Sequence, residues 1–335
     1  MSRAQFIHSY HDITSVESLL EAWGEFLVGK RSRRDVQEFE RNLMDYVLAL
    51  HAALQDKTYE HSGYEAFHIA DPKPRHIHKA TVRDRLVHHA IYRGLYPFFD
   101  KCFIYDSYSC RNDKGTHRAL NRFRAFARVA SCNHTRTCWV LKCDIKKFFA
   151  SVDQNILMEI IQSRIPDPNT VWLIGQVVSS FYSTEPGKGL PLGNLTSQLL
   201  VNVYMNEFDQ FMKHKLKAKY YIRYADDFVI LSHDKTWLQS LLPQVQEFLS
   251  KELRLTLHPN KVSITTVASG VDYLGWVHFT DHRVLRAVTK RRVLRGIKQS
   301  GSKPEVVQSY LGLLKHGNAW KIRKGVEEAV LVALG

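Results

Sequence analysis

The sequence predicts an α+β fold, in which helical segments accompany a small antiparallel sheet. Apolar residues recur three or four positions apart over the first fifty residues and again beyond residue 283, which is the spacing of an amphipathic helix. Two β-rich apolar runs, 220–224 and 228–231, flank an Asp-Asp pair and predict a hairpin. At about 150 residues per domain, the 335 residues allow roughly two domains or one large mixed fold.

The composition is that of a basic, folded chain. Apolar residues make up 44% and charged residues 24%, which excludes wholesale disorder and a low-complexity array. Lys and Arg number 47 against 33 Asp and Glu, a formal net charge of +14, so a polyanion is the expected partner. No stretch approaches the roughly 18 consecutive apolar residues of a membrane span, and the N-terminus has no apolar signal-peptide region. We therefore expect no membrane association and a cytoplasmic location.

Helices and one extended segment are predicted in the N-terminal third. The apolar spacing predicts helices near 16–27 and 39–50, separated by the basic break 29–34. Residues 65–79 are expected to be extended, because two X-Pro steps interrupt any helix there. A further helix is expected from 81 to 99.

The rest of the chain supplies the sheet and a basic helical end. Residues 138–143 read as a buried strand, and a helix is expected from about 195 to 217, with Asn194 as its N-cap. From 283 to 324 basic residues are frequent, Glu305 is the only acidic residue, and helical periodicity persists. This segment predicts a small basic helical domain.

Three acidic residues stand at the ends of apolar β-rich runs. Asp144 follows the run 138–143, and Asp226 and Asp227 lie at the tip of the predicted hairpin. A carboxylate on a buried strand is costly unless its charge is compensated, and a divalent metal is the usual compensation. Two Mg²⁺ ions roughly 3.5–4 Å apart, held by such carboxylates, catalyse in-line phosphoryl transfer. The alternative is plain turn chemistry, since Asp is common in turns.

Several segments resemble the sequence boxes of reverse transcriptases. The hairpin segment IRYADDFV at 222–229 resembles their Y-x-D-D box, and KCDIKKFF at 142–149 resembles their first palm box. Further matches follow in the family's order, namely GLPLG at 189–193, the pair Asn260-Lys261, and YLGW at 273–276. The ordered set spans roughly residues 70–320 and is far more specific than a single Y-x-D-D.

The resemblance implies a right-hand polymerase fold, with an antiparallel palm sheet and a helical thumb. The fingers with the N-terminal helices would occupy residues 1–105, and the palm would occupy 106–276, with a return to the fingers around 152–188. The basic thumb would occupy 277–335. The family's activity is RNA-directed DNA synthesis with two Mg²⁺ ions, or Mn²⁺ in their place.

The resemblance also implies catalytic and metal-binding roles. Asp144 and Asp226 would ligate both metals, Asp227 would support the site, and Ile145 falls among the metal- and nucleotide-binding positions. Lys261 stands where the family has a lysine proposed to protonate the pyrophosphate leaving group. A lysine at such a place can also be merely solvated.

Nucleotide-binding positions follow from the same comparison. Lys73 and Arg75 would hold the triphosphate, since the planar guanidinium of Arg pairs well with phosphate oxygens. Phe149 stands where the family places the aromatic gate against a 2′-hydroxyl, and Leu192 and Gly193 would adjoin the nucleotide. The plain alternatives are a solvated loop for Lys73 and Arg75 and a core aromatic for Phe149.

Template and primer positions are implied in three places. Arg111 would meet template or nucleotide phosphate, and Gln198 would lie near the template. Leu274, Gly275 and Trp276 would grip the primer end, although a buried strand turning into the thumb is compatible with the same residues.

Leu192 also indicates a subfamily. Most reverse transcriptases have glutamine before this glycine, whereas here Leu192 is followed by Gly193 and, further on, by Ser197-Gln198, as in enzymes of diversity-generating retroelements. Those enzymes, bacterial or carried by phages and prophages, copy a template-repeat RNA with errors opposite adenine. Leucine cannot offer the amide hydrogen bonds that help to hold a correct nucleotide, so discrimination should fall. Leu192 can also simply fill an apolar gap.

The implied partners are the template RNA, the nascent cDNA, dNTPs and a ring-forming accessory variability protein. Two other functions remain open. One is a stand-alone bacterial reverse transcriptase of a defence or other retroelement system with ordinary fidelity. The other is a non-catalytic RNA-binding protein on a decayed polymerase scaffold, against which the intact Asp144, Asp226 and Asp227 argue.

Overall fold

The computed structural model of the chain describes residues 6–70, 74–299 and 303–334. The chain forms two compact units. We call them the helical unit (Met1–Tyr105, Ile145–Lys217 and Val245–Leu257) and the sheet unit (Asp106–Asp144, Ala218–Gln244 and His258–Gly335).

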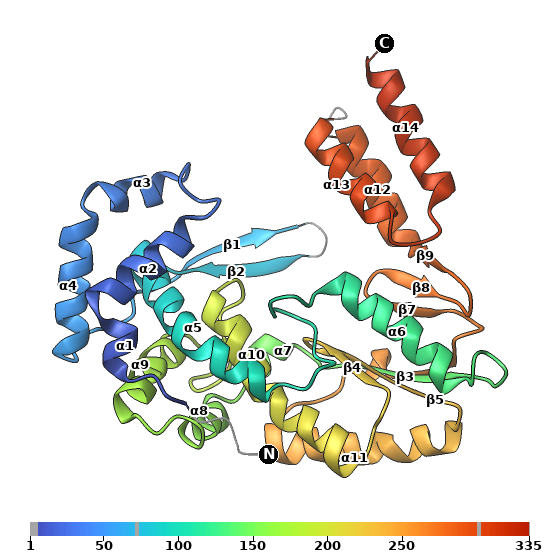
Figure 1. Cartoon of the computed structure of the whole chain (residues 1–335), viewed down its shortest axis with the longest axis horizontal. Coiled ribbons are helices and arrows are strands. Elements are labelled where there is room, and N and C mark those ends of the chain that lie inside the picture. Colours follow the sequence, from blue (N-terminus) through green and yellow to red (C-terminus); the bar gives the residue numbers. More distant parts are fainter. Residues whose placement is uncertain (1–5, 71–73, 300–302, 335) are drawn as a thin grey trace. The chain divides into compact units, whose positions relative to one another are not determined.

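The helical unit consists of helices and one β-hairpin (Figure 1). Its first segment contains α1 (Tyr10–Thr14), α2 (Val16–Leu27), α3 (Arg34–Arg41), α4 (Leu43–Gln55), β1 (Glu65–Ile69), β2 (Arg75–Lys79) and α5 (Val82–Cys102). Its later segments contain α7 (Phe148–Ser151), α8 (Gln154–Gln162), α9 (Pro168–Ser179), α10 (Leu195–Gln210), the π-helical turn Phe211–Lys215 and the end of α11 (Lys235–Leu253).

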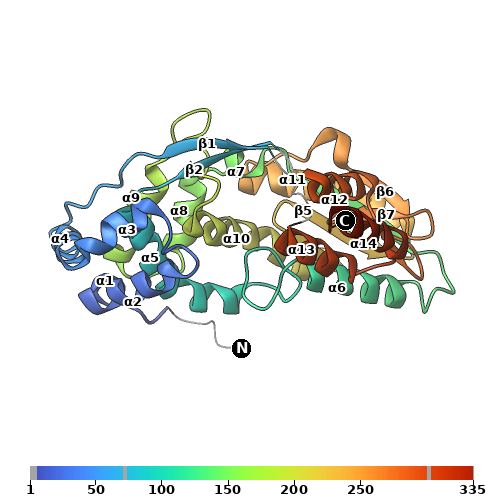
Figure 2. The same cartoon turned by 90° about the horizontal axis from the view of Figure 1, so that it is seen from above.

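Helix α5 is the centre of this unit and packs against α2 and α10 (Figure 1 and Figure 2). It begins at Thr81, whose side chain caps the helix by accepting from the backbone N–H of Asp84. Its apolar side chains, including Leu86 and Leu95, are fully buried. The predicted helix over 81–99 is therefore confirmed and extends slightly further.

The carboxyl of Asp84 is buried at the base of α5 within a set of hydrogen bonds. It accepts from the Tyr59 hydroxyl at 2.9 Å, the Thr81 hydroxyl at 2.6 Å and the Ser62 backbone N–H at 3.2 Å. Burial acts to raise the pKa of Asp84, but the hydrogen bonds and nearby His61 outweigh it, so that the pKa lies below its ordinary value. This network fixes the loop before the β1–β2 hairpin to α5.

The sheet unit holds two antiparallel sheets and a C-terminal group of helices. The larger sheet has the order β4-β5-β3-β6, and the smaller one has the order β7-β8-β9. The strands are β3 (Trp139–Asp144), β4 (Tyr221–Tyr224), β5 (Asp227–Ser232), β6 (Ser263–Thr266), β7 (Val271–Tyr273), β8 (Trp276–His278) and β9 (Arg283–Leu285). The helices are α6 (Thr116–Ala130), the start of α11, the 3₁₀ turn Pro259–Lys261, α12 (Ala287–Gln299), α13 (Pro304–Leu314) and α14 (Trp320–Leu334).

One apolar core joins these elements. Helix α6 packs on β4 and β5, and its Phe123 is buried in the same cluster as Tyr273 and Trp276 of the smaller sheet. The cluster continues through Val293 of α12 and Val326 of α14. Figure 2 shows α12, α13 and α14 packed together, in agreement with the predicted basic helical segment.

Most elements predicted from the sequence are present, with two local differences. The helix predicted near 39–50 is divided at Asn42, where α3 ends and α4 begins. Asn194 is the N-cap residue of α10, but its side chain does not cap the helix. The amide Nδ2 instead donates to the His78 carbonyl at 2.8 Å, which ties the start of α10 to β2. Within the residues that the structure describes, no helix is long and apolar enough to cross a membrane.

Replacing Asp84 with Asn should destabilise the protein by about 1–3 kcal/mol, because an amide cannot accept all the hydrogen bonds that the buried carboxylate accepts. A carboxyl with a lowered pKa stabilises the fold above its unfolded-state pKa and loses that contribution as pH falls through the lowered value. Urea unfolding of wild type and Asp84→Asn should therefore converge in acid. Glu38→Gln, which affects only an exposed ion pair, is the control. Equal stability of Asp84→Asn and wild type at neutral pH would contradict this account.

Candidate active site

Three aspartates meet at one end of the larger sheet. Strands β3 and β5 pair so that Asp144 lies opposite Asp227, with Cys143 opposite Phe228. Asp226 directly precedes Asp227 in the β4–β5 turn, where Ala225 adopts a left-handed conformation with φ 54°. The register of this one strand pair therefore brings together carboxylates more than eighty residues apart in the sequence.

The environment of Asp227 disfavours its ionised form. Burial raises its pKa to about 6, and the negative charges of Asp226 and Asp144 act in the same direction. Lys142 and Lys261 partly oppose this effect. The end of the sheet thus concentrates negative charge where water stabilises it poorly, and a bound cation would relieve the repulsion.

Lys261 forms an ion pair with Asp144 inside the sheet unit. Its Nζ lies 2.9 Å from Asp144 Oδ1, and the two side chains are 48% and 13% exposed. The backbone N–H of His258 donates to the Asp144 carbonyl at 2.7 Å, and Lys261 N–H donates to the His258 carbonyl at 3.0 Å. Lys261 is therefore placed at the aspartates by the 3₁₀ turn rather than merely solvated.

Arg223 is a functional candidate that the sequence reasoning missed. It is fully buried on β4, directly before the turn that carries Asp226. Its Nη1 donates to the Ala225 carbonyl at 3.2 Å, and its Nη2 donates to the Ser107 hydroxyl at 3.1 Å. The sequence does contain one indication of this role, which is a charged residue within an apolar strand. A buried Arg is rare unless its donors have partners.

The aspartates fit a divalent metal by their chemistry. Carboxylate oxygens are the ligands that Mg²⁺ prefers, and the partly buried carboxyl of Asp227 lies beside two like charges. Over residues 6–70, 74–299 and 303–334, however, no three or more His, Cys, Asp or Glu side chains form a ready-made metal cluster. The donors are present, and the arrangement is not a closed cage.

Two nucleotide-binding candidates of the helical unit are tied to the β1–β2 hairpin. The His78 N–H of β2 donates to the Leu192 carbonyl at 3.1 Å. Gly193 has φ 106°, and a Cβ there would lie 2.9 Å from Ile77 Cγ2, so a side chain would be both strained and crowded. Arg75, exposed at the start of β2, belongs to the same hairpin. The loop with Leu192 and the strand with Arg75 thus form one local assembly.

The remaining nucleotide, metal and template candidates of the helical unit differ in exposure and in the element that carries them. Phe149 lies on α7, partly exposed, with its ring edge-on to Phe148. Ile145 is fully buried and forms a β-bridge with Leu257. Gln198 lies in the first turns of α10, and Lys73 falls outside the described residues.

The template and primer candidates lie in the sheet unit. Arg111 Nη1 donates to the Ser107 carbonyl at 3.0 Å. Leu274 and Gly275 form the β7–β8 turn, both with positive φ, and are partly exposed. Trp276 is 1% exposed and lies in the core, so within this box the turn reaches the surface and the indole does not.

Comparison with known proteins agrees with the expected enzyme class. The family model described as "Reverse transcriptase (RNA-dependent DNA polymerase)" matches residues 70–278. The chain is 25% identical to Protein YkfC of Escherichia coli over 72% of this chain and 71% of that protein. It is 24% identical to the group II intron-encoded protein LtrA of Lactococcus lactis, over 72% of this chain and 50% of that protein. The chain thus spans about half of LtrA.

Solved structures agree at the level of the fold. An apo telomerase from Candida tropicalis superposes with a TM-score of 0.52 at 11% identity, covering 81% of this chain and 57% of that one. A C-terminally truncated apo telomerase from the same organism gives a TM-score of 0.50 at 11% identity, covering 72% of this chain and 60% of that one. Together with the family match, these similarities confirm the expected right-hand polymerase fold.

Replacing Arg223 with Met should lower the free energy of unfolding by about 1.5–3 kcal/mol, because the Ala225 carbonyl and the Ser107 hydroxyl lose a charged donor. Nucleotide incorporation should fall further than stability explains, since the turn carrying Asp226 loses its internal support. The measurements are urea unfolding and incorporation at a temperature where the variant is fully folded.

Arg34→Met is the matched control, because its ion pair with Glu38 is exposed and contributes little. Arg223→Lys, which keeps the charge but not the two-pronged geometry, should fall between wild type and Arg223→Met. Wild-type incorporation by folded Arg223→Met would show that the arginine does not position the turn.

Proposed function

The chain belongs to the reverse transcriptase family, and we propose that it is the RNA-directed DNA polymerase of a diversity-generating retroelement. It would copy a template-repeat RNA into cDNA with errors opposite adenine. The observation that carries this proposal is Leu192, an aliphatic residue where most of the family has glutamine, followed by Ser197-Gln198. The hydrogen bond of the Leu192 carbonyl with β2 holds this residue beside the hairpin of Arg75, which we propose binds the triphosphate.

The aspartates of the sheet unit would bind two Mg²⁺ ions. Bound ions would supply Lewis acidity that activates the primer 3′-hydroxyl and stabilises the leaving oxygen. Asp144 and Asp226 would provide the shared ligands, with Asp227 and the chain at Ile145 beside them. The raised pKa of Asp227 supports this assignment, since it reflects burial first and then the negative charges of Asp226 and Asp144, which a cation would offset.

Lys261 would hold the proton that neutralises the pyrophosphate leaving group. Its ammonium is anchored on Asp144 at 2.9 Å, so it is poised at the carboxylates while half of its side chain stays exposed. A lysine in this setting can exchange its carboxylate partner for a phosphate oxygen.

The other predicted positions complete the proposed site. Lys73 and Arg75 would bind the triphosphate, Phe149 would exclude a 2′-hydroxyl, and Gly193 would allow close approach of the nucleotide. Arg111, Gln198 and the residues Leu274, Gly275 and Trp276 would contact template and primer. We assign the fingers to 1–105, the palm to 106–276 with the fingers return around 152–188, and the thumb to 277–335. The proposed partners are template RNA, cDNA, dNTPs and an accessory variability protein.

A second candidate is a reverse transcriptase of ordinary fidelity from another bacterial retroelement or defence system. The similarity to a group II intron-encoded protein favours it. The catalytic chemistry would be the same, so the two candidates differ in error pattern and in the neighbouring genes. A nearby pair of near-duplicate repeats that differ mainly at adenines would favour the first.

Replacing Asp226 with Asn should reduce primer extension on poly(rA)/oligo(dT) with Mg²⁺ by at least about a hundredfold, because metal ligation supplies several kcal/mol of transition-state stabilisation. Asp144→Asn should have a similar effect. Glu247→Gln changes an exposed carboxylate on α11, paired with the exposed Lys251, and should retain activity. If Asp226→Asn extended the primer as fast as Glu247→Gln, the aspartates would not be the catalytic metal ligands.

Replacing Leu192 with Gln should lower the misincorporation frequency opposite template adenines by roughly tenfold to a hundredfold, since one regained hydrogen-bonding contact is worth about 1–3 kcal/mol. The measurement is sequencing of cDNA made from a defined RNA. Leu192→Met keeps the site apolar and is the control. An adenine error frequency that is the same in wild type, Leu192→Met and Leu192→Gln would contradict the proposed role and favour the second candidate.

A further inference from the structure

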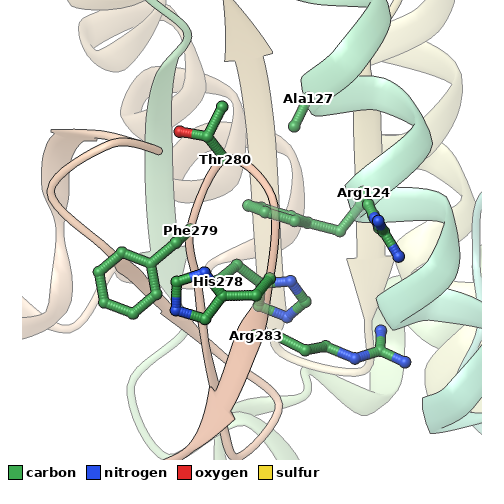
Figure 3. Close-up of a pocket in the computed structure, with 8 residues that line it drawn as sticks. Arg124, Ala127, His278, Phe279, Thr280 and Arg283 are labelled. Atoms are coloured by element: carbon green, nitrogen blue, oxygen red, sulfur yellow. The ribbon is translucent and has the colours of Figure 1, made fainter. Parts of the chain in front are cut away.

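Three adjoining hollows lie on the sheet unit between α6, the β8–β9 turn and the segment after α13. All three are lined by Arg124. The first, shown in Figure 3, shares Arg283 with the second, and the second shares Asp281 with the third. The second and third have volumes of about 410 Å³ and 900 Å³. We call these hollows the basic groove, after the cations that line them, namely Arg124, Arg128, Arg283 and Lys315.

The cations of the groove are not neutralised within the described part of the chain. None of the four forms an ion pair there, and the bonds of the arginines go to neutral oxygens. Arg124 donates to the Asp281 backbone carbonyl at 3.3 Å, and Arg128 donates to Asn133 Oδ1 at 3.0 Å. Arg283 donates to Asn121 Oδ1 at 3.1 Å and to the His316 carbonyl.

The acidic side chain at the rim offsets little of this charge. Asp281 is 84% exposed, and its carboxylate bonds to His282 Nδ1 at 2.8 Å rather than to an arginine. With four cationic side chains and one carboxylate, the groove keeps a net positive charge of about three.

Arg283 also has a donor without an acceptor. Its Nη1 is buried and has no hydrogen-bond partner, and a buried N–H left unpaired costs free energy. Burial and then the neighbouring Arg124 lower the pKa of Arg283, so the two guanidinium groups repel each other. Figure 3 shows both side chains extending on the same side of the first hollow. An anionic oxygen between the two guanidinium groups would screen this repulsion.

A planar surface adjoins these charges. The rings of His117 and His316 stack with centroids 3.4 Å apart and 17° between their planes, and His316 lines the second hollow. Burial lowers the pKa of both rings, which favours their neutral form. A neutral imidazole face is suited to stacking on a nucleobase.

The third hollow lies away from the aspartates within the sheet unit. Asn133 and His134 line it and precede β3, whereas Asp144 ends that strand. Five steps along a strand at about 3.3 Å each separate the two ends by about 16 Å. A chain bound in the third hollow would therefore not occupy the position of the three carboxylates.

We propose that the basic groove binds the phosphodiester backbone of RNA outside the segment being copied. Arginines without a carboxylate partner match the bidentate geometry of phosphate oxygens. The second hollow is lined by polar side chains and one glycine, without the apolar anchor that a protein partner would use. This proposal goes beyond polymerase activity, because it requires neither an active site nor any particular retroelement.

The test measures binding of poly(U) RNA to the full chain at increasing salt, with no primer and no nucleotides, so that its result is independent of DNA synthesis. Arg124→Glu combined with Lys315→Glu should weaken binding by about tenfold or more and reduce the slope of log K against log salt by about one for each lost phosphate contact. The variant Arg124→Gln with Lys315→Gln removes both charges without reversing them and should show the same trend with a smaller loss of RNA affinity. It provides the test if the charge-reversed variant does not fold.

Two reference variants separate the groove from net charge. Lys101→Glu together with Lys251→Glu makes the same charge change on α5 and α11, outside the groove, and should bind RNA with nearly the wild-type slope. If the groove and reference variants lost the same RNA affinity, the net charge of the protein alone would explain the loss, and the proposal would be wrong. Unchanged affinity and slope in the groove variants would also overturn it and leave an acidic protein surface as the partner to test.

Discussion

The antiparallel pairing of β3 with β5 places Asp144 opposite Asp227 and next to Asp226. Neighbouring residues of the sheet unit compensate part of the negative charge of these carboxylates. Three carboxylates at the end of a buried sheet repel one another, and burial opposes the ionisation of Asp227. The positive charges of Lys142 and Lys261 lower the pKa of Asp227 and so offset part of this negative charge, and Lys261 also pairs with Asp144. The residual deficit of positive charge is what makes the site suited to a divalent cation. One hydrogen bond from Arg223 reaches the carbonyl of Ala225, the residue of the adjoining turn that has a left-handed conformation.

The sequence predicted those parts of the site that depend on local pattern. Apolar runs ending in Asp144 and in the Asp226–Asp227 pair specify strands and a hairpin, because period and turn chemistry act over a few residues. The ordered boxes then identified the family, and the match over 70–278 agrees with them. Lys261 was named on its box alone, and its ion pair with Asp144 is a contact between residues 117 apart.

What the sequence did not predict depends on distant segments. Arg223 looked like one more residue of a strand, and its significance appears only with the Ser107 and Ala225 oxygens around it. The basic groove draws Arg124, Arg283 and Lys315 from three separate elements, and no spacing rule connects them. Net charge indicated a polyanion, but only the fold separates cations that have carboxylate partners, such as Arg122 with Asp106, from those that have none.

The contact between Gly193 and Ile77 has a consequence for how this enzyme can change over time. Because any side chain at 193 would meet Ile77 Cγ2 at 2.9 Å, and because the Leu192 carbonyl and the Asn194 amide both bond to His78, the loop and the hairpin cannot drift independently. A substitution that reshapes one would require a compensating substitution in the other. Variation in the loop that carries Leu192 should therefore be found paired with variation in β2, so that the two segments change as coordinated sets of residues rather than by single replacements.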